Sequence, residues 1–275
     1  MSFISLDGRM LPADEPALRV DNRGYRYGDG LFETIKVCHE RILLAPLHFD
    51  RFFSGLRLLE MNIPPYLTPH KLSEDILQLC AHNKCAGLAR VRLSVFRGHG
   101  GIYDGDDQLH YVIESSGLAD TINRLNESGL VTGVYPEAQK SCDLFSGLKS
   151  ANYLPYTMGA LYAKQRQWND SFILNTEGRV ADATIANVFI IKEGRLSTPP
   201  LSEGPVDGVM RRHLLTVLPG IAERPLNIDE IMEADEIFLT NAISGIKWVR
   251  EFQGKAFRGE QTAIIYHEHV KAIWK

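Results

Sequence analysis

The sequence lacks a long apolar segment and an excess of charge of one sign, and each absence excludes a class of protein. No apolar run approaches the roughly 18 residues that cross a bilayer, and the opening MSFISLDGRM lacks the charged-then-apolar order of a signal peptide. The net charge is −4, and no basic cluster is interleaved with aromatic residues. We therefore expect a cytoplasmic protein with neither a membrane nor a nucleic acid as partner.

Paired cysteines are also missing. The four cysteines, Cys38, Cys80, Cys85 and Cys142, are scattered and form no C-x-x-C motif. The histidines show no metal-ligand spacing, and His267 and His269 lie two apart without a second pair of ligands. Reduced thiols are therefore favoured over disulfides, and we assign no metal site.

The composition is that of an ordinary globular protein. The apolar fraction is 44% and the charged fraction is 23%. The length of 275 residues is enough for one large domain or two modest ones. Residues 115–128 lose clear periodicity and read as a connection. We predict a small α+β domain over residues 1–117, a connection over 118–128, and a larger domain over 129–275.

Alternating and helical patterns give the expected elements of the first domain. Asp7-Gly8 is a strong hairpin signal between two short strands, and residues 23–30 read as a glycine-rich loop. Helices are expected over residues 46–60 and 68–83. Further strands are expected at residues 18–22, 31–37, 42–44, 88–96 and 109–114.

The second domain is expected to contain a helix ending near residue 165 and another over residues 209–218. A short helix is expected at residues 228–232, and a last helix is expected over residues 262–274. Strands are expected at residues 130–135, 171–174, 180–190, 195–197, 224–226, 235–240 and 246–249. Lys149 precedes the first of these helices, and Asp182 lies on the strand expected over 180–190.

Taken singly, the polar residues of these segments have ordinary interpretations. Lys149 could be an exposed lysine at a helix start, Asp182 a strand carboxylate facing water, and Arg51 a salt-bridged surface residue. Tyr153 could be a tyrosine of an amphipathic helix, and Arg97 and His99 could belong to a solvated loop. Position alone does not decide between these readings and a functional one.

Seven motifs, in order along nearly the whole chain, resemble the class IV aminotransferases. These are pyridoxal-phosphate enzymes of fold type IV, and they include branched-chain aminotransferases, D-amino acid aminotransferases and aminodeoxychorismate lyases. The motifs are RGYRYGDGLFET, HFDR, RGHGG, GLKSANYL, VADATIANVF, DGVMRR and ADEIFLTNAI. Each is weak alone, but the ordered set is specific, and it implies a two-domain α+β fold of the D-amino acid aminotransferase type.

The resemblance implies a Schiff base between Lys149 and the aldehyde of pyridoxal 5'-phosphate. The amine of such a lysine must be neutral at working pH to form the Schiff base. Once substrate displaces it, the free amine can move the proton of the substrate Cα. Asp182 stands where the family has a glutamate that pairs with the pyridine nitrogen. Aspartate is one methylene shorter, by about 1.5 Å of reach, so the contact could run through water or the ring could lie closer to the strand.

Other cofactor and substrate contacts are implied in the same way. Arg51 would bind the phosphate with its guanidinium fork, together with the backbone N–H groups of Val209 and Met210 at a helix start. Tyr153 would hydrogen-bond the phenolic oxygen of the cofactor, and Val206 would pack against the ring. Ala242 stands where the family often has a phosphate-binding threonine, for which Thr240, Asn241 or Ser244 could compensate. The sequence does not separate these three, and Asn241 is placed among the cofactor contacts. Substrate contacts are implied for Tyr27, Phe32, Arg97 and His99.

We therefore expect a pyridoxal-phosphate enzyme that moves an amino group between an amino acid and a 2-keto acid. An aminodeoxychorismate lyase, which forms 4-aminobenzoate and pyruvate, is the alternative, and a non-catalytic binding protein is a remote third. The resemblance also implies a homodimer, with the loop over residues 97–107 near the active site of the other subunit.

Overall fold

The computed structural model describes residues 2–274, and their contacts divide the chain into two compact units. The first unit runs to Thr121 and also contains the segment Lys149–Asn152. The second unit contains Ile122–Leu148 and the chain from Tyr153 onward. Sequence patterns placed Lys149 in the larger domain, whereas its contacts assign it to the smaller unit.

The first unit is built on a six-stranded antiparallel sheet in the order β2-β1-β6-β5-β3-β4. The hairpin expected around Asp7-Gly8 is confirmed, because β1 and β2 pair directly across this turn. The strands are β1 (Phe3–Leu6), β2 (Arg9–Pro12), β3 (Gly30–Cys38), β4 (Arg41–Ile42), β5 (Leu88–Arg97) and β6 (Leu109–Gly117).

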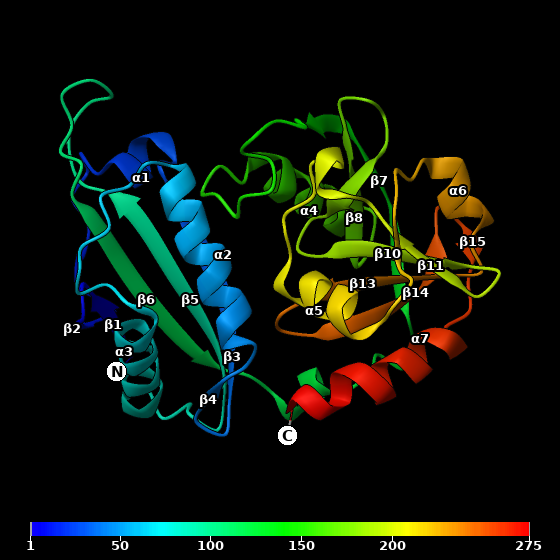
Figure 1. Ribbon diagram of the computed structural model, residues 1–275, viewed down its shortest axis with the longest axis horizontal. Coiled ribbons are helices and arrows are strands. Elements are labelled where there is room, and N and C mark those ends of the chain that lie inside the picture. The colour runs from blue at the N-terminus through cyan, green and yellow to red at the C-terminus, as the bar shows by residue number, and fades with distance from the viewer. Residues whose placement is uncertain (1, 275) are drawn as a thin grey trace. The chain divides into compact units, whose positions relative to one another are not determined.

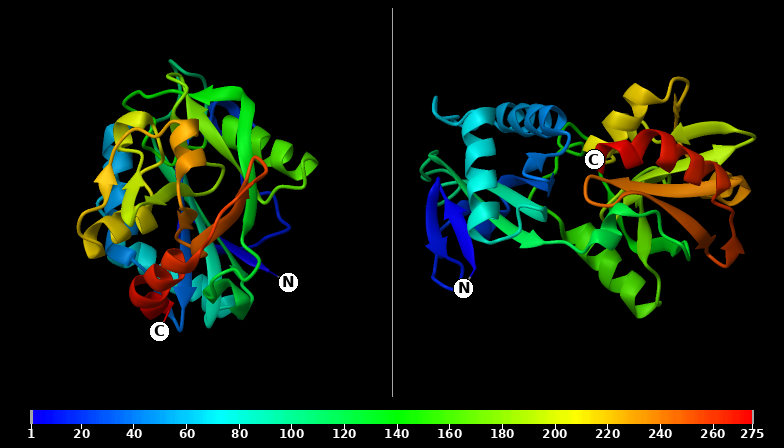
Figure 2. Two further views of the ribbon diagram at one scale, coloured as in Figure 1. Left: turned by 90° about the vertical axis from the view of Figure 1, so that its right-hand side faces the viewer. Right: turned by 90° about the horizontal axis from the view of Figure 1, so that it is seen from below.

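Two helices, α2 (Ala45–Leu58) and α3 (Pro69–His82), cover one face of this sheet (Figure 1). Glu33 of β3 contacts α2, and Tyr111 of β6 bonds α3; strand alternation places both side chains on this face. Thr68 caps α3 by accepting from the backbone N–H of Lys71 at 3.1 Å. The hairpin β1–β2 and helix α3 lie side by side in both figures (Figure 2).

The first unit departs from expectation before β3. Residues 18–22 form no strand, although Asn22 makes one isolated bridge to His99. The expected glycine-rich loop contains a short helix, α1 (Arg23–Tyr27). The side chain of Asn22 caps this helix at 3.0 Å, and Gly28 ends it at a φ of 65°, a conformation that glycine adopts without strain.

The second unit contains a mixed nine-stranded sheet in the order β12-β11-β10-β13-β14-β7-β8-β9, with β15 paired to β14. The pairs β11–β12, β7–β14 and β7–β8 are parallel. Apolar residues of β8, β9, β10, β13 and β14 share one core, so the sheet curls around it. The strands are β7 (Leu130–Lys140), β8 (Asp170–Asn175), β9 (Val180–Ala183), β10 (Asn187–Lys192), β11 (Arg195–Thr198), β12 (Ala222–Glu223), β13 (Glu236–Asn241), β14 (Gly245–Phe252) and β15 (Lys255–Ala256).

The single strand expected over residues 180–190 is wrong, because the chain turns between β9 and β10. The backbone N–H of Ala183 donates to the carbonyl of Ala186 at 2.8 Å. Asp170 holds the turn by accepting from the backbone and hydroxyl of Thr184 at 3.0 and 2.6 Å. The break lets β9 pair with β8 while β10 pairs with β13.

The helix expected to end near residue 165 is confirmed as α4 (Leu154–Gln165). Residues 149–151 precede it and are held along the edge of β3. The carbonyl of Lys149 accepts from the N–H of Phe32, and the N–H of Ala151 donates to Gly30, both at 2.9 Å. Pro155 then falls in the first turn of α4, where a missing N–H costs nothing.

The remaining helices are α5 (Val209–Val217), α6 (Ile228–Glu233) and α7 (Glu260–Ile265). Beyond α7 the last expected helix continues as a π turn over Tyr266–Val270 and a 3₁₀ turn over Lys271–Trp274, shown in red in Figure 2. The strand expected at residues 224–226 is wrong, since Pro225 has no N–H to donate and pairing stops at Glu223. Within residues 2–274 no helix is both long and apolar enough to span a bilayer.

Candidate active site

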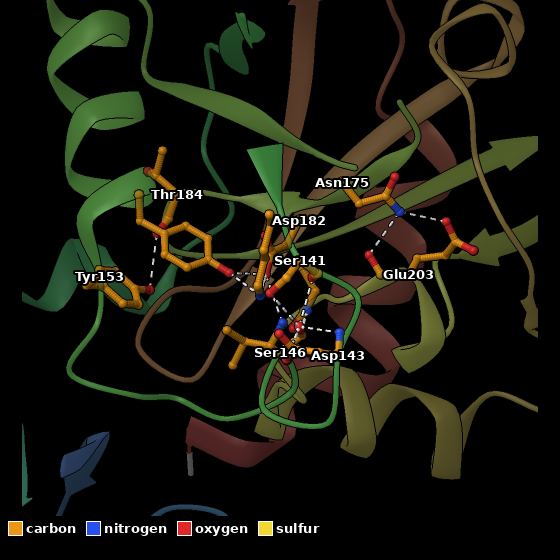
Figure 3. A network of polar contacts seen from close by, with 12 residues as sticks. Ser141, Asp143, Ser146, Tyr153, Asn175, Asp182, Thr184 and Glu203 are labelled. Atoms are coloured by element: carbon orange, nitrogen blue, oxygen red, sulfur yellow. Dashed lines mark hydrogen bonds and ion pairs between the residues drawn. The ribbon is translucent and has the colours of Figure 1, made fainter. Parts of the chain in front are cut away.

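A buried carboxylate on β9 is the centre of the second unit's polar network (Figure 3). One oxygen of Asp182, Oδ2, accepts from the backbone N–H of Val206 at 2.8 Å and from the hydroxyl of Tyr156 at 2.9 Å. The ammonium of Lys140 lies 3.5 Å from the same oxygen. The other oxygen, Oδ1, is buried and has no hydrogen-bond partner among the described residues. The site therefore presents one unused acceptor on an otherwise fixed carboxylate.

The charges of this network oppose the cost of burial. Burial raises the pKa of Asp182, while the charge of Lys140 and the bonds from Val206 and Tyr156 act against this rise. Burial likewise lowers the pKa of Lys140, although Asp182 favours its charged form. The pKa of Tyr156 lies well above its usual value because the phenol is buried beside the carboxylate. Asp182 and Lys140 therefore each favour the ionised form of the other.

Tyr153 lies next to this network at the start of α4. Its hydroxyl donates to the carbonyl of Thr184 at 3.2 Å (Figure 3). Its ring lies 4.4 Å from that of Tyr156. Val206 and Tyr153 also pack in one apolar cluster with Tyr156. Three residues implied by the resemblance, Asp182, Tyr153 and Val206, are therefore neighbours in the second unit.

The N-terminus of α5 provides a cradle for an anion. Val209 and Met210 open this helix, so their backbone N–H groups have no partner within it. Gly208 caps it, and a Cβ at this position would come within 1.8 Å of Oδ1 of Asn187. Thr240, on the strand that pairs with Asn187, has a buried hydroxyl with no hydrogen-bond partner among the described residues. Helix N–H groups and a spare hydroxyl are suitable donors for a phosphate.

Asn241 and Ser244 form the turn after β13. The side-chain oxygen of Asn241 accepts from the backbone N–H groups of Ile243 and Ser244 at 3.0 and 2.8 Å, and from the hydroxyl of Ser244 at 2.9 Å. This use of Asn241 shapes the loop that contains Ala242. Of the three residues that sequence could not separate, Thr240 has the side chain whose hydrogen bonding is unsatisfied.

Lys149 belongs to the first unit, where its segment extends the edge of β3. Its ammonium lies 4.5 Å from the ring centroid of Phe32, and the guanidinium of Arg92 lies 3.8 Å from the same centroid. Both contacts are within cation–π range. The ring of Phe32 therefore places a second cation near the half-buried lysine. Sequence reasoning missed Arg92, because its place on alternating strand β5 becomes informative only once β3 is its neighbour.

Arg51 is buried on α2 and is tied to Glu33. Its Nε and Nη2 donate to the two carboxylate oxygens of Glu33 at 2.8 and 2.6 Å, and Nδ1 of His48 lies 2.7 Å from Oε2. Burial alone would raise the pKa of Glu33, but the charges of Arg51 and His48 outweigh it and lower this pKa to about 2. The guanidinium of Arg51, which was expected to bind the phosphate, therefore uses two of its three nitrogens to bind the carboxylate of Glu33.

The residues implied for the substrate lie in separate surroundings of the first unit. Arg97 pairs with Asp29 at 3.0 Å and donates to the carbonyl of Leu59. His99 lies near Asp21, and its backbone N–H is bonded by Asp106. The fold also groups ring nitrogens of His99 and His110 with Asp106, within 4.8 Å of one another. Asp106 accepts backbone N–H groups of the loop through both of its oxygens.

Tyr27 ends α1 and is exposed, whereas Phe32 is buried on β3. The polar network around Asp182 contains two residues that the sequence had not indicated, Lys140 and Tyr156. Lys140 ends the strand β7, and Tyr156 follows Tyr153 by three residues in α4. A lysine at the end of an apolar strand and a second tyrosine on the same helix face were the available signals.

Comparison with known proteins agrees with these features. The model of the family described as amino-transferase class IV matches residues 30–252. A Methanocaldococcus jannaschii protein assigned as a branched-chain-amino-acid aminotransferase is 26% identical over 95% of this chain and 92% of its own. The aminodeoxychorismate lyase of Bacillus subtilis is also 26% identical, over 98% of this chain and 95% of its own. The chain is thus equally similar to a relative assigned as an aminotransferase and to a lyase.

A solved structure supports the fold. The branched-chain aminotransferase of Thermoproteus uzoniensis, crystallised with norvaline, superposes with a TM-score of 0.88 at 22% identity and covers 99% of this chain and 95% of its own. The expectation of an α+β fold of type IV is thereby confirmed. The same comparisons confirm pyridoxal phosphate as the cofactor.

Proposed function

Because this chain belongs to the class IV aminotransferase family, we propose that it moves an amino group between an amino acid and a 2-keto acid with Lys149 as the reactive lysine. Pyridoxal phosphate, when bound, supplies an aldehyde that takes the amino group and a ring that withdraws electrons from the substrate. The task of the chain is to hold this cofactor, orient the substrate and move one proton.

The observation that carries this proposal is the unsatisfied Oδ1 of Asp182. A buried polar atom without a partner is costly, and in native proteins it calls for an explanation such as a catalytic role or a bound ion or water. A protonated pyridine nitrogen is a donor of the required kind, and Oδ2 is already fixed by Val206 and Tyr156. We assign Asp182 to the ring nitrogen, Tyr153 to the phenolic oxygen, and Val206 to one face of the ring.

Lys149 would carry the proton chemistry. Its Nζ would take the proton from the substrate Cα and return it one position away, which is general base and then general acid catalysis. The guanidinium of Arg92, which contacts the same ring of Phe32 as Lys149, is suited to an anionic group of the substrate. Substrate contacts of Tyr27, Arg97 and His99 remain part of the proposal.

The phosphate would be bound by the N–H groups of Val209 and Met210, with the hydroxyl of Thr240. Asn241 would act through the turn that it shapes, and Arg51 would add positive charge from its pair with Glu33. The donor set fits a dianion, because helix N–H groups, a hydroxyl and a guanidinium are all donors.

Substitution of Gly208 by alanine tests this cradle. The added Cβ would displace Asn187, whose side-chain amide donates to the carbonyl of Val206 at 2.7 Å. We expect the affinity for pyridoxal phosphate to fall about tenfold or more, since about 1.4 kcal/mol of lost binding suffices for that. Equilibrium dialysis of the apoprotein measures it. Gly87→Ala, at a glycine with no atom near the added Cβ, is the control, and equal affinities of both variants would contradict the assignment.

The alternative activity is that of an aminodeoxychorismate lyase, for which the identity to the B. subtilis enzyme is the supporting observation. One assay separates the two. A lyase releases pyruvate from aminodeoxychorismate with no amino acceptor, whereas an aminotransferase needs a 2-keto acid acceptor for turnover. We expect turnover with an amino acid and 2-keto acid pair, and the enantiomer of the amino acid that is consumed then identifies the branch. Pyruvate release without an acceptor would establish the lyase instead. A homodimer, as in the sequence expectation, is part of the proposal and is measured by light scattering.

A further inference from the structure

Lys140 is a buried cation at the carboxylate that we assign to the cofactor ring. Its side chain is 10% exposed, and its ammonium lies 3.5 Å from Oδ2 of Asp182 and also bonds the hydroxyl of Tyr156. A lysine is almost never buried without a paired charge, because burial disfavours the ammonium. Its place at the end of β7 therefore calls for a reason beyond packing.

We propose that Lys140 is a positioning residue that keeps Asp182 ionised and turns its Oδ1 toward the ring nitrogen of the cofactor. This inference rests on the proposed placement of the ring at Asp182. Lys140 itself touches neither cofactor nor substrate in this assignment; it acts through the carboxylate.

The groups around Asp182 show why a cation is needed there. The hydroxyl of Tyr156 bonds Asp182 from α4, and the ring of Tyr153, just before that helix, lies 4.4 Å from the ring of Tyr156. Asp170 lies nearby on β8, and Val206 contributes only a backbone N–H. Burial raises the pKa of Asp170 to about 6, and Asp182 adds to that rise, so this neighbour favours the neutral form of either acid. Among the described residues that the ion-pair and hydrogen-bond geometry places at Asp182, Lys140 is the cation.

The same contacts fix the direction of the carboxylate. Lys140, Tyr156 and the N–H of Val206 all converge on Oδ2, and the other oxygen is left for a ligand. A shorter aspartate has less reach than the glutamate of the resemblance, so its orientation matters more. Three contacts on one oxygen supply that orientation. A neutral carboxylic acid at this place could no longer form an ion pair with a protonated ring nitrogen.

The experiment measures cofactor binding by the apoprotein as a function of pH, using pyridoxal phosphate and equilibrium dialysis. The variants are Lys140→Met, Lys140→Arg and Asp182→Asn, with Lys164→Met on the exposed face of α4 as control. Removal of an opposite charge at this distance raises the pKa of a carboxyl by about 1 to 3 units. The affinity for pyridoxal phosphate should fall as the pH is lowered. We therefore expect this fall to occur at a pH higher by about this amount in Lys140→Met, and close to the wild-type pH in Lys140→Arg and Lys164→Met.

The outcomes separate this inference from the assignment on which it rests. One outcome is that affinity in Lys140→Met falls at the same low pH as in the wild type, while Asp182→Asn no longer shows this fall. This outcome overturns the role of Lys140 and leaves the placement of the ring at Asp182 intact. If the affinity of Asp182→Asn still falls at low pH as in the wild type, the placement of the ring at Asp182 is overturned as well. A purely structural role would weaken binding equally at all pH values. If Lys140→Met does not fold, Lys140→Gln, also neutral, gives the same comparison.

Discussion

Replacement of Lys149 by alanine should abolish turnover and covalent attachment of the cofactor together. On the proposed assignment, the variant loses both the amine that would join the cofactor and the group that would move the substrate proton. Acid–base catalysis alone contributes about 10² to 10⁴-fold, so we expect kcat to fall by on the order of 10⁴-fold or more. Borohydride treatment followed by peptide mapping should find the cofactor on Lys149 in the wild type and on no peptide of the variant.

Lys164→Ala is the matched control for this result, because Lys164 is an exposed lysine in the last turn of α4. It should retain wild-type kcat and the wild-type labelled peptide. Labelling of a different lysine in the wild type would overturn the assignment of Lys149. Noncovalent cofactor binding by Lys149→Ala should persist, since the phosphate and ring contacts are proposed for other residues.

Asp182→Asn should be the second most damaging change. The amide keeps the shape of the side chain but removes the negative charge that would hold a proton on the ring nitrogen. Loss of one preorganised electrostatic contact costs about 10² to 10³-fold in kcat, and we expect a fall of that size. The burial of Lys140 adds to the damage, because its ammonium then lacks its partner. Steady-state kinetics with an excess of cofactor measures the effect apart from weaker binding.

Asp182→Glu is the informative companion, since it restores the residue type that the resemblance leads one to expect. It keeps the charge and adds reach, and we expect it to retain more activity than the asparagine variant. Asp182→Asn with unchanged kcat would show that this carboxylate does not serve the ring. Equal losses in both variants would instead indicate that the packing around Asp182 is what the reaction needs.

The fold could be read from the sequence where local signals coincide with pairing. The helix α2 has a proline at its start and apolar residues at helical spacing, and the hairpin turn at Asp7-Gly8 is a local signal. The turn between β9 and β10 was missed because it depends on Asp170, which lies on another strand. The pairing of residues 149–151 was missed for the same kind of reason: their hydrogen bonds go to β3, far earlier in the sequence.

The site was predictable to the extent that ordered motifs exist. They pointed to Asp182 and Tyr153, which the structure places near each other, and to Val209 and Met210 at the start of α5. They could not indicate that Arg51 spends most of its guanidinium on Glu33, since the pairing joins a strand to a helix. Lys140 was overlooked because a lysine at a strand end is normally solvated, and only the fold shows that it is buried.

The segment Lys149–Asn152 adds to the edge of β3, although all six strands of the first unit's sheet precede it in the chain. A nascent chain can form the six strands early, but the backbone groups of Gly30 and Phe32 lack these partners until residue 151 has been synthesised. An open strand edge of this kind is a template for pairing with other chains. The step that positions Lys149 is thus also the step that closes this strand edge, so the two would be completed together during folding.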